Sequence, residues 1–277
     1  MPATLTIARL TLHEARSRRI LLAALIFGLA FLALFATGMY FIDRNLRLEN
    51  LVLSKRRFVL SSVVMAGLYA VNFLTIITAV LVPADTLSGE ISSGIIQTVV
   101  SKPLRRSEVV LGKWIGFWII LLGYLGLMAG GVLLAAKLIG NYSPPNIYTG
   151  LSLMCLEGTL LLTLSIAGGT RLSTITNGVM VFGMYGVAFI GGWMEQIGTM
   201  ADNAAARYLG IAASLLVPCE SLWRLAAYYM QPKLMRDLQL TPFSSASVPN
   251  GTMVLWAATY TVLSLVFALW QFRKRNL

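Results

Sequence analysis

The chain has 277 residues, of which 57% are hydrophobic and only 12% are charged. Soluble domains contain about 45–50% apolar and about 25% charged residues, so this composition indicates a membrane protein and leaves no room for a large soluble catalytic domain. The formal net charge of +11 would suggest nucleic-acid binding in a soluble protein. Here the basic residues form short clusters between apolar runs, which points to lipid headgroups as partners and not to nucleic acid.

Six stretches of the sequence carry almost no formal charge, and each predicts one membrane-spanning helix. They lie at residues 20–42, 58–82, 114–137, 148–170, 174–194 and 252–272. Each reaches the roughly 20 residues that a helix needs to cross hydrocarbon, and a helix satisfies its own backbone hydrogen bonds there. We therefore predict an all-α integral membrane protein in which residues 1–277 form a single transmembrane domain with six transmembrane helices.

An even number of spans places both chain ends on the same side of the membrane. The basic residues near the two ends are Arg9, Arg16, Arg18, Arg19, Arg273, Lys274 and Arg275. Because the cytoplasmic ends of spans carry an excess of Lys and Arg, we expect the N and C termini in the cytoplasm.

Residues 3–19 precede the first span and predict an N-terminal interfacial helix. Its small and apolar residues at helical spacing are Leu5, Ala8, Leu12 and Ala15. Arg9 and His13 lie on another face, and this division is typical of a helix that lies in the plane of the membrane surface.

A long extracytoplasmic segment, residues 195–250, separates the last two spans. Its apolar stretches at residues 208–217 and 222–230 are each too short to cross the membrane alone. They therefore either lie in the interface or re-enter the membrane.

The usual catalytic groups are missing from the expected spans. The single histidine, His13, precedes the first span, so no imidazole is available inside the membrane. Gly112 and Lys113 lack the upstream glycine loop of a phosphate-binding turn, so the chain has no ATP site of that kind. The four aspartates Asp43, Asp85, Asp202 and Asp237 all fall outside the predicted spans. We predict no catalytic residue and no metal site, and therefore no enzyme.

Two polar residues are predicted inside spans. Glu157 lies about ten residues into the fourth span, where an unpaired charge costs at least ~2.5–3.5 kcal/mol, so it is either protonated or paired. It is a candidate for lining the pathway, with a packing role between helices as the alternative. The same two interpretations apply to Asn72 in the second span.

One face of the third span is rich in glycine. The glycines that share it are Gly112, Gly116, Gly123, Gly126 and Gly130. Such a face allows another helix to approach closely, either within the chain or across a dimer axis.

The segment at residues 84–107, between spans two and three, predicts a short amphipathic helix on the cytoplasmic side. Leu87, Ile91 and Ile95 recur at four-residue steps before Pro103. Ser107 is expected to cap the next helix, whose positive N-terminal end also suits an acidic residue. An apolar stripe of this kind needs a membrane surface or the groove of a partner.

The same segment carries a series of short motifs. They are Gly89-Glu90, Gly94, Ile95-Ile96, Ser101-Lys102-Pro103, Arg106-Ser107, Glu108 and Gly112-Lys113. In this window the sequence resembles the permease subunits of ATP-binding cassette (ABC) transporters of the ABC type-2 class. The six spans and the long outer segment are consistent with that resemblance.

The resemblance implies the transmembrane subunit of an ABC exporter in the plasma (inner) membrane. Its partners would be a cassette ATPase subunit, a second permease copy in a homodimer or heterodimer, and membrane lipids. The chain itself would bind no cofactor, because ATP and Mg would sit on the partner ATPase. The residues implied for ATPase coupling are Leu87, Gly89, Glu90, Ile91, Gly94, Ile95, Gln97, Pro103, Arg105 and Arg106. The alternative is a non-transporting membrane scaffold or sensor that anchors a cytoplasmic partner.

Overall fold

The computed structural model describes residues 3–16, 19–49, 53–92, 105–238 and 247–274, and all regular structure in these ranges is helical. The helices are α1 (Ala3–Arg16), α2 (Arg19–Leu48), α3 (Leu53–Ser92), α5 (Arg106–Gly140), α6 (Ile147–Gly169), α7 (Thr174–Met200), α8 (Ala204–Leu216), α9 (Cys219–Met230), α10 (Lys233–Leu238) and α11 (Gly251–Arg273). Among the described residues, six helices are long and apolar enough to cross a membrane, namely α2, α3, α5, α6, α7 and α11. This confirms the six predicted spans.

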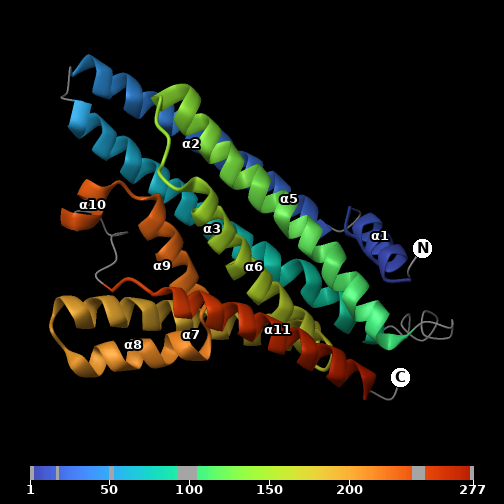
Figure 1. Cartoon of the computed structure of the whole chain (residues 1–277). Coiled ribbons are helices and arrows are strands. Elements are labelled where there is room, and N and C mark those ends of the chain that lie inside the picture. The colour runs from blue at the N-terminus through green and yellow to red at the C-terminus, as the bar shows by residue number, and fades with distance from the viewer. Residues whose placement is uncertain (1–2, 17–18, 50–52, 93–104, 239–246, 275–277) are drawn as a thin grey trace.

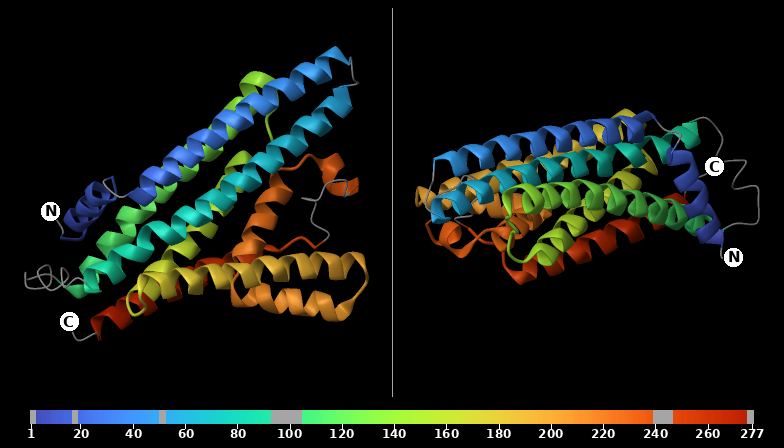
Figure 2. Two further views of the ribbon diagram at one scale, coloured as in Figure 1. Left: turned by 180° about the vertical axis from the view of Figure 1, so that it is seen from behind. Right: turned by 90° about the horizontal axis from the view of Figure 1, so that it is seen from above.

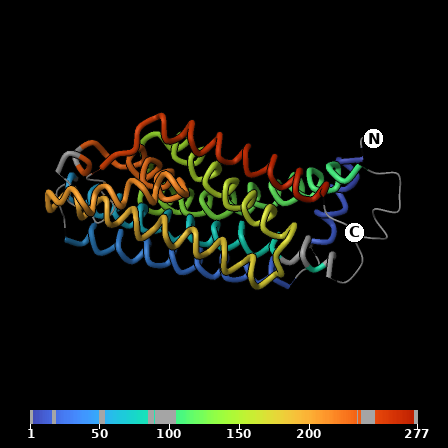
Figure 3. Tube along the Cα trace, turned by 90° about the horizontal axis from the view of Figure 1, so that it is seen from below, coloured from blue at the N-terminus to red at the C-terminus, as the bar shows by residue number. Residues whose placement is uncertain are grey.

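The long helices run side by side as an elongated bundle, with both chain ends at one end of it (Figure 1). We call this the terminal end, and the opposite end, which holds the α5–α6 connection at residues 141–146 and α10, the distal end. Helices α2 and α11 lie on opposite outer faces (Figure 3).

Helix α6 is the central element, because it packs against α3, α5, α7, α9 and α11. The indole N–H groups of Trp114 and Trp118 on α5 donate to threonine hydroxyls one turn apart on α6, at 2.9 and 3.0 Å. Ser165 of α6 donates to a backbone carbonyl of α3 at 2.8 Å. Hydrogen bonds between helices hold such a bundle together where the lipid supplies little hydrophobic driving force.

Most helices extend beyond the predicted spans. Helix α2 continues six residues past position 42, and α3 passes through Pro83 without a break to Ser92. Charged residues mark the limit of hydrocarbon but not the end of a helix, because Lys, Arg and Glu are good helix formers. In the described part of the segment at residues 84–107, residues 84–92 continue α3 as one helix. Residues 93–104 lie outside the described ranges.

Helix α1 crosses α5 at the terminal end (Figure 2), and two glycines make the close approach possible. A Cβ atom built on Gly112 would lie 2.7 Å from the Ile7 side chain and 2.8 Å from a backbone oxygen of α1. One built on Gly116 would lie 2.8 Å from Thr11. The described residues that α1 buries include Ile7, Ala8, Thr11 and Ala15. Of the four residues predicted to share one face, Ala8 and Ala15 are buried and Leu5 is 53% exposed, while Ile7 and Thr11 pack against the glycines of α5.

The rest of the predicted glycine face is uncovered within the chain. Gly123, Gly126 and Gly130 have no described atom within 4 Å of a Cβ position. Only the part near the terminal end therefore serves packing inside the chain.

We expect Gly112→Ala to displace α1 from α5, because the added methyl group meets backbone as well as side chain. Overpacking of this kind costs about 1–3 kcal/mol. Limited trypsin digestion at Arg9 in detergent should then be accelerated. Gly123→Ala is the matched control on the same helix, and equal protection of α1 in the two variants would contradict the close crossing.

An ion cluster around Asp43 joins three helices at the distal end. The Asp43 carboxylate accepts from Arg47 Nε at 2.7 Å and from Arg56 Nη2 at 2.6 Å. The two guanidinium groups also lie 3.4 and 3.5 Å from the carbonyl oxygens of Ile139 and Gly140, where α5 ends. They thus satisfy carbonyls that have no partner inside their own helix. Asp43 was predicted outside the spans, yet it belongs to the continuous helix α2 and is buried.

Replacing Asp43 with Ala leaves Arg56 without its partner, and we expect a loss of about 1–3 kcal/mol in the free energy of unfolding. This is below the value for a fully buried pair, because both arginines are partly exposed. Thermal unfolding in detergent measures the effect. Asp202→Asn is the control, since Asp202 is exposed and its positive φ of 49° suits Asn.

Candidate functional site

Helices α8 and α9 form a bent pair against the spans. They meet at an angle of 104°, and together they are apolar enough for a broken span or a re-entrant loop. Figure 2 shows α8 running back along α7 before α9 turns toward the distal end. Helix α9 is almost entirely buried, between α6 and α7. The two apolar stretches at residues 208–217 and 222–230 thus belong to the two arms of this bent pair.

A buried ion pair holds α9 in place. Arg224 Nη2 of α9 donates to Glu195 Oε2 of α7 at 2.6 Å, and the two side chains are 4% and 8% exposed. The hydroxyl of Ser247, just before α11, donates to the other Glu195 oxygen at 2.5 Å. Glu195 was predicted as the first residue of the outer segment, but α7 continues to Met200 and carries it inside. The pair lines a small cavity of about 220 Å³ with Ser214 and Ser221.

The two predicted intramembrane candidates lie together in the bundle. Glu157 on α6 is 0% exposed, and Asn72 on α3 is buried beside it. Neither carboxyl oxygen of Glu157 has a hydrogen bond of standard geometry to any described residue. Among the described residues no cation pairs with Glu157, and Asn72 is a neighbouring side chain that can donate to its carboxyl group.

Further polar groups surround this carboxyl. Glu220 of α9 lies within electrostatic range of Glu157, and Tyr69 of α3 and Tyr185 of α7 lie within range of both acids. We call Asn72, Glu157, Glu220, Tyr69 and Tyr185 the buried carboxyl cluster. Four helices contribute to it, so any movement of α9 against α3, α6 or α7 changes the surroundings of two acids.

Sequence reasoning missed Glu220 and the Glu195–Arg224 pair. The residues of α9 were treated as part of an outer segment, so their charges were not expected inside the protein. A signal was available, because Glu220 and Arg224 are four residues apart and share one face if the segment is helical. Their buried partners on other helices could not be read from spacing.

A groove of about 570 Å³ runs between α6, α7 and α11. Its walls are mostly apolar and include Met180, Met184 and Phe267, while Arg171 and Gln271 lie at the terminal end. The Gln271 side chain accepts from the Thr170 hydroxyl at 2.6 Å, which ties α11 to the end of α6. The groove offers an apolar surface along the bundle with polar groups at one end.

The structure places the predicted coupling residues in two groups. Leu87, Gly89, Glu90 and Ile91 belong to the last turns of α3, beyond the stretch Ser54–Ala84 that is apolar enough to span. Arg105 caps α5 and Arg106 begins it, and Arg106 Nη1 lies 3.4 Å from the Arg273 carbonyl oxygen of α11. Gly94, Ile95, Gln97 and Pro103 lie outside the described residues.

The start of α5 differs from the prediction. The backbone N–H of Arg105 donates to the Glu108 carboxylate at 2.9 Å, so Arg105 and not Ser107 is the capping residue. Glu108 lies in the first turn, as its charge predicts. The cap fixes the point at which the chain re-enters the bundle from the terminal end.

No model of a known protein family matches the chain, and no curated protein matches it. Among the described residues, no group of three His, Cys, Asp or Glu side chains is placed to hold a metal ion. The functional interpretation therefore depends on the sequence motifs and on the geometry of the bundle.

Two isosteric substitutions distinguish the buried acids. We expect Glu195→Gln to lower the free energy of unfolding by about 3–5 kcal/mol, because Arg224 remains as an unpaired buried cation. Glu157→Gln should change it by less than about 1 kcal/mol, because the structure provides no ionic partner to lose. Thermal unfolding of both variants in one detergent measures the difference. Equal losses would show that Glu157 has a charged partner.

Proposed function

We propose that the chain is the transmembrane subunit of an ABC exporter of the ABC type-2 class. In this role it forms the substrate pathway across the plasma membrane and couples it to ATP hydrolysis by a separate ATPase subunit. The observation that carries the proposal is the position of the motif-bearing segment. Helix α3 continues past its apolar stretch to Ser92, so the helix carries Gly89 and Glu90 beyond that stretch at the terminal end.

Other features of the terminal end support the proposal. Helix α1, the start of α5 and the last turn of α11 all lie there (Figure 1). Since the termini are basic, the proposed cytoplasmic side is the side on which an ATPase would bind. A displacement applied to the end of α3 would reach α6 through direct helix contacts, because packed helices shift as rigid elements.

The pathway would lie where the chain offers uncovered surface to a second copy. The groove between α6, α7 and α11 is apolar along its length and has polar groups at the terminal end. At the other end of α7, the bent pair α8–α9 would act as the re-entrant element that closes the exit. Transport would then require the terminal end and the distal end of the bundle to change conformation together.

The test is ATPase stimulation in a reconstituted complex. Glu90→Ala and Ile95→Asp should reduce the ATPase activity that the permease stimulates in a co-purifying cassette ATPase by roughly tenfold or more, because an anchoring contact of about 1.4 kcal/mol is lost. Membrane insertion and thermal stability should not change. Glu49→Ala is the matched control, since Glu49 is exposed at the distal end of the bundle.

Unchanged stimulation in both coupling variants would contradict the proposal. A chain that binds a cytoplasmic partner but stimulates no ATPase would instead match the scaffold or sensor alternative. Labelling of a cysteine placed at Glu90 from outside intact cells would contradict it independently.

A further inference from the structure

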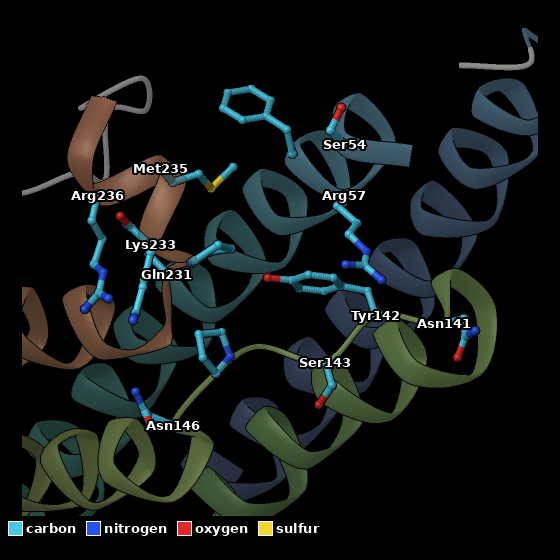
Figure 4. Close-up of a pocket in the computed structure, with 13 residues that line it drawn as sticks. Ser54, Arg57, Asn141, Tyr142, Ser143, Asn146, Gln231, Lys233, Met235 and Arg236 are labelled. Atoms are coloured by element: carbon cyan, nitrogen blue, oxygen red, sulfur yellow. The ribbon is translucent and has the colours of Figure 1, made fainter. Parts of the chain in front are cut away.

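A large cavity lies at the distal end of the molecule, away from the proposed coupling segment. It measures about 740 Å³, within the range of small-molecule sites. Its walls come from the start of α3, the α5–α6 connection and the segment from the end of α9 into α10 (Figure 4). We call it the distal pocket.

The charged side chains on its walls, among the described residues, all have one sign. Arg57 reaches in from α3, and Lys233 and Arg236 come from α10 on the opposite wall (Figure 4). No Asp or Glu among the described residues lines the pocket, and none of the three cations forms an ion pair with a described residue. Their neighbour Arg56 differs, because Asp43 neutralises it.

Arg236 is held in position. Its guanidinium lies 4.6 Å from the centroid of the Tyr228 ring, and its buried Nε has no hydrogen-bond partner among the described residues. A buried donor without a partner is unfavourable by about 1–3 kcal/mol. This Nε is closed to a ligand by its own burial, whereas an anion in the pocket would compensate the positive charge of the three cations that line it.

The remaining walls are largely apolar. Phe58, Tyr142, Pro145, Pro232 and Met235 line the pocket beside the cations. The charge-free run of α3 begins at Phe58, directly after Arg57, so the cations stand at the level where hydrocarbon gives way to headgroups. A ligand with its anion at Arg57 would place an apolar body beside Phe58.

We propose that the distal pocket binds a phosphate group, and that a phospholipid headgroup supplies it. Arginine forks and a lysine ammonium together match the tetrahedral oxygens of a phosphate ester. Basic pockets between spanning helices are recognised sites for anionic lipid headgroups. The apolar wall favours a lipid over free phosphate, which has nothing to place there. This inference does not depend on the exporter function.

The experiment counts bound lipid by native mass spectrometry on the full chain, purified with phosphatidylglycerol or phosphatidylcholine. The pocket variant is Arg57→Gln, Lys233→Gln and Arg236→Gln combined. The control variant is Arg44→Gln, Lys55→Gln and Arg207→Gln combined, which removes the same charge from exposed residues that do not line the pocket. We expect the control to retain phosphatidylglycerol like the original chain and the pocket variant to lose roughly tenfold in occupancy.

A second variant fills the cavity without changing charge. Ser143 is exposed on the pocket wall, so Ser143→Trp should lower phosphatidylglycerol retention while thermal stability in lipid-free detergent stays the same. Equal retention in the pocket and control variants would overturn the proposal. The assignment to a lipid would be overturned by a different pair of results. In that case inorganic phosphate would stabilise the original chain but not the pocket variant, and the original chain would retain no lipid. Loss of ATPase stimulation in the coupling variants would leave the lipid count unchanged.

Discussion

The pairing of Arg224 with Glu195 is the interaction on which the inner part of this structure depends. It holds the short helix α9 among helices that are apolar enough to span a membrane. A buried arginine alone would carry a large desolvation penalty, and the carboxylate compensates for it only when the geometry is good. The 2.6 Å contact pairs Nη2 of Arg224 with one Glu195 oxygen and Ser247 donates to the other, while Nε and Nη1 of Arg224 have no hydrogen-bond partner among the described residues. The pair therefore fixes α9 to α7 and also ties in the segment that leads to α11.

Polar groups inside the bundle also need partners at the distal end, and there a different set of residues supplies them. Helix α5 ends there, and its last carbonyl groups lack partners within the helix. Arg47 and Arg56 direct N–H groups toward those carbonyls while Asp43 neutralises their charge. Arg57, one residue further along α3, has no such carbonyl or carboxylate partner among the described residues and lines the distal pocket instead. Arg56 thus has a structural role, whereas the adjacent Arg57 has the binding role that we propose for the distal pocket.

The six spans could be predicted from the sequence because hydrocarbon excludes charge over a fixed length. Helix ends could not, because α2 continues through Asp43 and Arg47 with no change in local preference. The predicted site was found in part. Glu157 and Asn72 were identified as unusual inside an apolar run, and they lie together. The sequence did not identify Glu220 or the Arg224–Glu195 pair. These residues come close only because of the bent course of α8 and α9, which spacing along the chain does not show.

That course has a consequence for how the two ends of the bundle communicate. Helix α6 packs against α3 and against α9, so it is the physical link between the segment at the terminal end and the bent pair. Glu157 of α6 and Glu220 of α9 lie within electrostatic range of each other, and Arg224 lies within range of Glu220. Two acids in this position respond to small changes in helix separation, because their interaction and hydration depend on distance. Under the proposed function, a shift of α3 would therefore change both the packing and the electrostatic surroundings of α9. During such a shift, the Arg224–Glu195 pair would either stay intact and hold α9 to α7, or break and release it.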